Sequence, residues 1–267
     1  MSSISFTGYK VKITSFDFKS QRTSPQSLSL AWLNDTMKNL CPLGRVVLFS
    51  VYRKARYKVI VNKLVVGPFA SNCYIIGTES SREGMIVDPG AEAKQILNRV
   101  KDLELDIKSI FLTHGHIDHI AALKEVKEAT GAEVAIHADD AKSLHSQSLG
   151  TIFGLSFPPS PPPDKLLKGG DTIDIGDLHF LVLHTPGHTP GGACLFGHGV
   201  VFSGDTLFNY GIGRTDLSGG SYNQLMNSIH TKLMVLADDT IVYPGHGPAT
   251  TIGTERSGNS FLHSPIL

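Results

Sequence analysis

Short apolar runs bounded by turn residues dominate the chain from residue 57 onward. Runs rich in Val, Ile, Leu and Phe that stop at Gly, Pro or Asn are typical of buried strands. Segments whose apolar residues recur at i, i+3 and i+4 predict helices instead. We expect strands at residues 58–66, 72–78, 84–90, 109–114, 172–177, 179–187, 193–205 and 240–247.

Helices are expected between these strands. Residues 91–103 and 221–233 carry apolar positions at helical spacing, residues 119–131 predict a helix that ends at Gly131, and residues 132–144 predict a strand followed by a helix. Strands dominate and helices are interspersed among them. This order favours an α/β fold in which two sheets are covered by helices on their outer sides.

The first 56 residues differ from the rest of the chain. They are rich in Ser and basic residues, as in KSQRTSPQS, and their apolar residues alternate poorly. We interpret residues 1–56 as an N-terminal extension with little packed structure. Residues 57–267 are interpreted as one domain that carries the function.

Charge and composition argue against several classes of function. Lys plus Arg and Asp plus Glu both number 24, so the zero net charge gives no signature of nucleic-acid or anionic-membrane binding. No apolar run approaches the roughly 18 residues of a membrane helix, and the N-terminus shows no secretory signal pattern. The three cysteines are scattered, which indicates a reducing compartment, so we expect a cytoplasmic protein.

Histidine placement carries the chemical signal, and the chain has 12 of them. The stretch THGHIDH follows a predicted strand and supplies His114, His116, Asp118 and His119. Strand ends meet at one edge of layered α/β folds, where glycine lets the backbone pass close to a ligand. Three later strands each deliver one more such residue just past their ends, namely His188, Asp205 and His246.

The spacing within THGHIDH predicts two metal ions. His114 and His116 alternate with a glycine in an extended segment and can face one ion, whereas the next two ligands begin a helix and face another. Imidazole and carboxylate ligands of this kind suit Zn²⁺, and also Fe or Mn, and three histidines leave an open position for water. We assign metal one to His114, His116 and His188, metal two to Asp118, His119 and His246, and the bridge to Asp205.

Four motifs in this order, THGHIDH, TPGHTPGG, FSGDTLF and YPGHGP, resemble those of the metallo-β-lactamase fold superfamily. The resemblance covers about residues 58–262. It implies a four-layer αββα sandwich of two mixed sheets, with helices on the outer faces and the metal ions at one edge between the sheets. Within this superfamily, DTLFNYGIGRTDLSGG and HGPATT are similar to the small glyoxalase II-like (hydroxyacylglutathione hydrolase-like) branch. That similarity implies a small-molecule thioester substrate such as S-D-lactoylglutathione.

Two further residues have open interpretations. Arg214, in GIGRTD, matches a basic position that holds a glutathione carboxylate in glyoxalase II relatives, so the resemblance implies a substrate-binding role. A surface ion pair with Asp216 is the alternative for this residue. Asp88, in IVDPG, either orients a ligand histidine from outside the metal site or caps the turn before the helix at 91–103.

The resemblance implies a hydrolase in which a metal-bridging hydroxide attacks the thioester carbonyl and Asp118 orients that hydroxide. A thiolate leaves without a strong acid, because a thiol has a pKa of about 8.5. The chief alternative is a persulfide dioxygenase, which would use one iron held by His114, His188 and Asp205. A non-catalytic metal-binding module is a third possibility, but structural zinc usually includes thiolate ligands. The sequence leaves the oligomeric state open.

Overall fold

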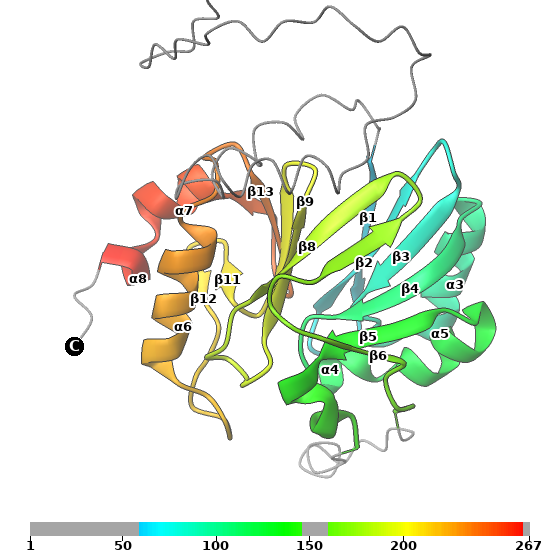
Figure 1. The fold of residues 1–267 in the computed structure, drawn as a ribbon, viewed down its shortest axis with the longest axis horizontal. Coiled ribbons are helices and arrows are strands. Elements are labelled where there is room, and N and C mark those ends of the chain that lie inside the picture. The colour runs from blue at the N-terminus through cyan, green and yellow to red at the C-terminus, as the bar shows by residue number, and fades with distance from the viewer. Residues whose placement is uncertain (1–58, 146–159, 264–267) are drawn as a thin grey trace, which may run out of the picture. The chain divides into compact units, whose positions relative to one another are not determined.

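The computed structural model describes residues 59–145 and 160–263. The extension expected at residues 1–56 lies outside these ranges, so its interpretation stays a prediction. The described residues form two six-stranded sheets and one two-stranded sheet, and helices lie outside the two large sheets (Figure 1).

The first sheet is mixed. Its first three strands pair antiparallel, and the remaining pairs are parallel. In spatial order it consists of β1 (Val59–Val66), β2 (Ser71–Thr78), β3 (Glu83–Val87), β4 (Asp106–Leu112), β5 (Glu133–His137) and β6 (Lys165–Leu167).

The second sheet is also mixed, because β10 and β13 pair parallel while the other neighbours pair antiparallel. A short hairpin of β11 (Leu207–Phe208) and β12 (Gly211–Ile212) forms the two-stranded sheet. In spatial order the second sheet consists of β14 (Thr250–Thr251), β13 (Ile241–Pro244), β10 (Val200–Gly204), β9 (Ala193–Gly197), β8 (Leu178–His184) and β7 (Thr172–Ile175).

The helices fall into two groups by their place in the chain. Those around the first sheet are α3 (Ala93–Asp102), α4 (Ile117–Ile120), α5 (Leu123–Thr130) and the 3₁₀ helix η2 (Ala138–His145). Those that follow β12 are α6 (Tyr222–Ser228), the π-helical turn η4 (Ile229–Leu233), α7 (Ile252–Gly258) and α8 (Ser260–His263).

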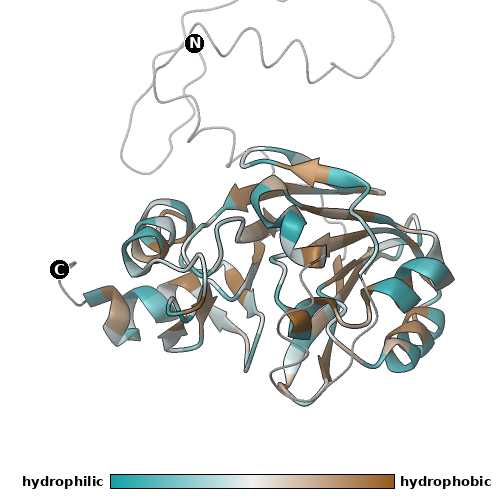
Figure 2. Ribbon diagram, turned by 90° about the horizontal axis from the view of Figure 1, so that it is seen from below, coloured by the Kyte–Doolittle hydropathy of each residue, from teal (hydrophilic) through white to brown (hydrophobic). Residues whose placement is uncertain are grey.

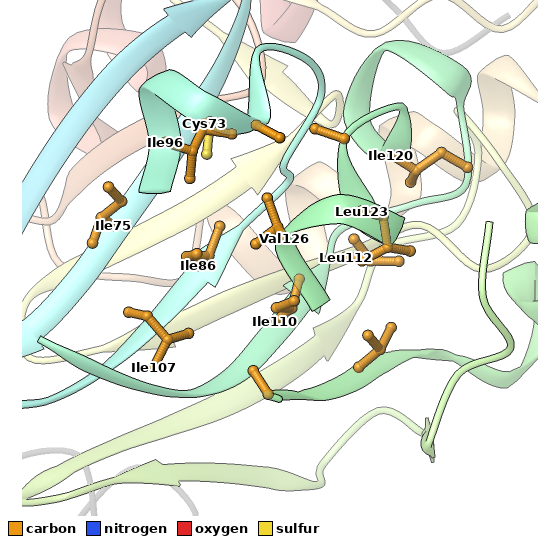
Figure 3. Close-up of a cluster of buried hydrophobic side chains, with 14 of the residues drawn as sticks. Cys73, Ile75, Ile86, Ile96, Ile107, Ile110, Leu112, Ile120, Leu123 and Val126 are labelled. Carbon is orange, nitrogen blue, oxygen red and sulfur yellow. The ribbon is translucent and has the colours of Figure 1, made fainter. Parts of the chain in front are cut away.

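Alternation along the strands divides the core into layers. On β2, Cys73 and Ile75 belong to the cluster shared with α3 and α5, and Figure 3 shows Cys73 close to Ile96. Tyr74 and Ile76 belong instead to the cluster between the two sheets. Because successive side chains of a strand point to opposite faces, β2 is buried on both of its faces.

A third apolar cluster joins the second sheet to its helices. Val201 of β10 and Val242 of β13 pack with Leu225 of α6 and Ile252 of α7. Helix, sheet, sheet and helix therefore form four layers, and the predicted αββα architecture is confirmed. Figure 2 shows the interior strands coloured mainly as hydrophobic, while α3 and α5 carry hydrophilic residues on their outer sides.

The helix expected at residues 119–131 ends as predicted, because Gly131 is the C-cap of α5, but its start and its continuity are wrong. α4 begins earlier, at Ile117, and a separate helix, α5, begins at Leu123. The break falls at Ala122, whose backbone N–H donates to the carbonyl oxygen of Pro89 at 3.0 Å rather than to one in its own helix. A contact with a distant part of the chain ends the first helix, and a local apolar pattern does not contain that information.

Two other expectations also differ from the structure. The strand expected at residues 193–205 is the hairpin of β9 and β10, which turns at His198 and Gly199 with φ angles of 53° and 78°. The helix expected in the second half of 132–144 is the 3₁₀ helix η2. Within the described ranges, none of the helices has the length and hydrophobicity needed to cross a membrane.

Candidate metal centre

The seven residues predicted as metal ligands follow strands of both sheets, on loops and on the short helix α4. The loop after β4 carries His114 and His116 and runs directly into α4, which carries Asp118 and His119. The loop after β8 carries His188, β10 ends one residue before Asp205, and β13 ends two residues before His246. The two sheets meet here through their backbones, because Asn72 N donates to Gly245 O at 2.7 Å.

The first group of potential ligands is His114, His116 and His188. Each offers a ring nitrogen within 4.8 Å of the others. His188 Nε2 lies 2.9 Å from His116 Nδ1, and the Nε2 atom of the fully buried His114 has no hydrogen-bond partner. The structure therefore brings together the three residues that were assigned to metal one.

The second group is Asp118, His119 and His246, again with one potential ligand atom each within 4.8 Å of the others. Asp118 Oδ2 lies 3.2 Å from His246 Nε2 and 3.4 Å from His119 Nε2. The three residues assigned to metal two are thus also adjacent in space.

Asp205 lies between the two groups. Its Oδ2 is 3.5 Å from His188 Nε2 in the first group, and its Oδ1 is 3.5 Å from His119 Nε2 in the second. Its Oδ2 also lies 3.6 Å from His246 Nε2. This is the arrangement expected of a carboxylate that bridges two ions.

Three atoms of this cluster test whether the residues fit metal ions. His114 Nε2, His119 Nε2 and Asp205 Oδ1 are buried and have no hydrogen-bond partner. An unpaired buried polar atom costs about 1–3 kcal/mol, and a coordinated cation would remove that cost. The donor set of imidazole nitrogen and carboxylate oxygen suits Zn²⁺, Fe and Mn. The two groups are therefore consistent with a dinuclear metal site.

Contacts outside the groups orient the histidine rings. Asp88 Oδ2 lies 3.0 Å from His119 Nδ1, and the same carboxylate accepts hydrogen bonds from the backbone N–H and the hydroxyl of Thr113 at 2.8 and 2.6 Å. His188 Nδ1 donates to Arg214 O at 2.8 Å. Of the two interpretations open for Asp88, the geometry favours the contact with a histidine, because the residue before α3 is Glu92.

The electrostatic environment differs between the two groups. Burial, reinforced by neighbouring histidines, lowers the pKa of His114 well below 6.5 and that of His116 to about 4. Burial also disfavours the charged form of His119, but the carboxylates of Asp205 and Asp88 outweigh it and raise the pKa to about 10. His114 and His116 thus favour the neutral imidazole, while His119 retains a proton when no ion is present.

Sequence reasoning missed two polar residues near the centre. Ser71, at the start of β2, donates from its hydroxyl to Asp118 Oδ2 at 2.9 Å. Asp140, in η2, accepts hydrogen bonds from Gly115, Thr189 and Gly191. Both are buried, yet each reads in the sequence as an ordinary polar residue at an element boundary.

Arg214 lies at the surface, with its side chain 61% exposed. Its guanidinium donates to both carboxylate oxygens of Asp216, at 2.8 and 2.7 Å. The ion pair considered from the sequence is present in the structure. An exposed pair contributes only about 0–1 kcal/mol, so a substrate carboxylate could compete for this arginine, and the binding role stays a prediction.

A further cluster of His137, Asp139 and His184 lies outside the two groups. The two imidazole rings stack with centroids 3.9 Å apart and planes inclined by 11°. A metal ion must lie in the plane of each imidazole that binds it, and stacked rings have separate planes. This cluster therefore does not present both histidines to one ion in the observed geometry.

Comparison with known proteins places these features in a family. The family model described as metallo-beta-lactamase superfamily matches residues 66–246. The chain is 39% identical over 204 residues to the hydroxyacylglutathione hydrolase GloC of Haemophilus influenzae, covering 74% of this chain and 96% of that protein. It is also 39% identical over 206 residues to the probable metallo-hydrolase YqgX of Bacillus subtilis, covering 75% of this chain and 96% of that protein.

Two solved structures show the same similarity in three dimensions. The B3 metallo-beta-lactamase BLEG-1 has a TM-score of 0.73 and 37% identity, covering 77% of this chain and all of that one. The protein TTHA1623, solved in a di-iron-bound form, has a TM-score of 0.70 and 36% identity, covering 76% of this chain and all of that one.

Proposed function

This chain belongs to the metallo-beta-lactamase superfamily, and from that membership we propose that it is a dinuclear metal-dependent hydrolase that cleaves small-molecule thioesters. The observation that carries the proposal is the pair of ligand groups joined by Asp205, with three buried atoms that lack partners. The similarity to GloC over nearly its whole length supports a hydroxyacylglutathione-like substrate, because that compound is a thioester.

The residues of the chain have distinct tasks in this proposal. One ion would be held by His114, His116 and His188, and the other by Asp118, His119 and His246. Asp205 would contact both ions. When bound, two divalent ions would acidify a water molecule and polarise the carbonyl group of a thioester.

The surrounding hydrogen bonds prepare these side chains. Asp88 and the carbonyl of Arg214 engage Nδ1 of His119 and His188, which leaves the Nε2 atom of each ring for an ion. The hydroxyl of Ser71 holds Asp118 Oδ2 in place from the side of β2. No protein acid is needed for the leaving group, because a thiol with a pKa of about 8.5 departs as a thiolate.

One preparation can test the proposal against its alternatives. We would measure the metal content of the purified protein and assay the same sample with S-D-lactoylglutathione, with a β-lactam, and with a persulfide under oxygen uptake. We expect about two divalent ions per chain and thiol release from the thioester. A single iron with oxygen consumption would favour the persulfide dioxygenase, and cleavage of the β-lactam alone would favour a lactamase.

A pair of variants would test the dinuclear assignment. His119→Ala should remove one ion and lower turnover at least about 100-fold, because positioned metal ligands act together. His230→Ala, in η4 and outside both ligand groups, is the matched control and should retain metal and activity. Unchanged turnover in the His119 variant would contradict the two-ion mechanism.

A further inference from the structure

Asp140 is a buried carboxylate that neither ligand group includes. Only 3% of the residue is exposed, and it lies in η2, the 3₁₀ helix that follows β5. Its Oδ1 accepts a hydrogen bond from Gly191 N at 2.6 Å. Its Oδ2 accepts hydrogen bonds from Gly115 N at 3.2 Å and from the hydroxyl of Thr189 at 2.7 Å.

These three donors belong to the two loops that carry the first ligand group. Gly115 lies between His114 and His116, and Thr189 directly follows His188. The loops come from different sheets, one after β4 and the other after β8. One carboxylate therefore ties together the backbone on both sides of the first metal position.

The loops lie close against η2, which keeps this geometry tight. A Cβ atom on Gly115 would lie 1.6 Å from Ser143 Oγ, and one on Gly191 would lie 2.5 Å from Asp140 N. The absence of a side chain at both positions lets each backbone N–H reach the carboxylate. The hydroxyl of Ser143 donates to Asp140 O and so holds the same turn of η2 in place.

The contacts require a carboxylate rather than an amide. All three partners donate, and an ionised carboxylate accepts at both oxygens. In an asparagine at this position, the NH₂ group would face the backbone N–H of either Gly191 or Gly115, whichever way the amide is turned. Asp140→Asn therefore loses at least one backbone contact while it preserves the shape of the side chain.

We propose that Asp140 is a positioning residue that holds the loops of His114, His116 and His188 together and thereby sets the affinity of the first metal position. This inference rests on the metal centre proposed above. Residues that orient ligands in this way typically change metal affinity by about 10–100-fold when they are substituted.

The test measures metal binding directly and isolates each position. In a His119→Ala background, which retains the first ligand group, we would titrate the chelator-treated protein with Co²⁺ and record its visible absorption spectrum. Adding Asp140→Asn should weaken Co²⁺ binding about 10–100-fold and alter the absorption bands. In a His116→Ala background, which retains the second group, the same substitution should change the affinity less than about twofold.

Glu255 offers a matched control. It is also a fully buried carboxylate with three donors, from the backbone of Tyr210 and the side chains of Thr250 and Asn259. Glu255→Gln should lower thermal stability and leave the Co²⁺ affinity of the first position unchanged. If Asp140 only stabilises the fold, Asp140→Asn should likewise lower thermal stability and leave the Co²⁺ affinity of the first position unchanged.

The outcomes separate the two proposals. If the single variant His119→Ala binds Co²⁺ and Asp140→Asn lowers only its thermal stability, the positioning role is wrong and the metal centre stands. If the unsubstituted protein binds no Co²⁺, the proposed function fails and the positioning role fails with it. Should Asp140→Asn not fold, Thr189→Val removes a single donor at similar volume, and unchanged Co²⁺ affinity in that variant would also overturn the role.

Discussion

Proton release should distinguish the two metal positions. In the metal-free protein, burial lowers the pKa of His114 well below 6.5 and that of His116 to about 4, so both are neutral at pH 7. For His119, nearby carboxylates overcome burial and raise the pKa to about 10, and the pKa of His246 is raised as well. An ion at the second position must therefore displace at least one proton, whereas His114 and His116 release none.

The size of the effect follows from the pKa of His119. Between pH 6.5 and 8.5 this residue stays protonated in the metal-free protein, so each pH unit favours metal binding by 1.36 kcal/mol, or tenfold. Over two units, the affinity of the second position should rise at least about 100-fold, which corresponds to about 2.7 kcal/mol. His114 and His116 are already neutral over this range, so they add no such rise at the first position.

Two single variants make this measurement specific. His116→Ala disrupts the first group and reports on the second position, while His119→Ala does the reverse. Zn²⁺ affinity would be measured by competition with a fluorescent chelator at several pH values, after circular dichroism has shown that each variant is folded. Equal pH slopes in the two variants, or a flat response in His116→Ala, would refute the reasoning.

Three other predictions follow from the site. Gly115→Ala should reduce the metal content of the protein, because the new Cβ atom would lie 1.6 Å from Ser143 Oγ. Adding Ser143→Gly should restore part of the metal content, and full metal content in the single variant would contradict the prediction. Ser71→Ala removes a hydrogen bond to the charged carboxylate of Asp118 and should weaken Zn²⁺ binding at the second position about tenfold. Competition with a chelator would measure this, and an unchanged Zn²⁺ affinity would argue against the contact. The free energy of unfolding of the metal-free protein in urea should fall as the pH rises from 7.5 to 9, by up to about 1.4 kcal/mol per pH unit. The raised pKa of His119 contributes stability that is fully present below pH 6.5 and is lost as the pH rises through about 10. His119→Gln should flatten this dependence, and a flat profile in the unsubstituted protein would contradict it.

The cluster of histidines and aspartates could be predicted from the sequence because its signal is local. His114, His116, Asp118 and His119 lie within six positions, directly after an apolar run that predicts a strand. The remaining members each follow a strand and stand beside Gly or Pro. Since strand ends of a layered fold converge, the pattern contains both the chemistry and the place of the site.

Residues that act across long sequence separations could not be predicted in this way. Ser71 contacts Asp118, which is 47 positions away, and Asp140 contacts Thr189, which is 49 positions away. Each reads locally as a turn or helix-end residue, and only the packing of two sheets makes it a buried contact. α7 was also missed, and its buried Glu255 accepts a hydrogen bond from the backbone N–H of Tyr210, 45 positions away.

The division of the predicted ligands between two sheets has a consequence for the stability of the protein in the cell. Four of the predicted ligands lie between β4 and the end of α4, while His188, Asp205 and His246 lie on loops of the other sheet. Bound ions would therefore act as a clip across the edge where the sheets meet, as a crosslink does between distant segments. We expect that edge to open more often when metal is scarce, which would expose its glycine-rich loops to proteases. The abundance of the folded protein should then follow the metal supply of the cell, even where its synthesis is constant.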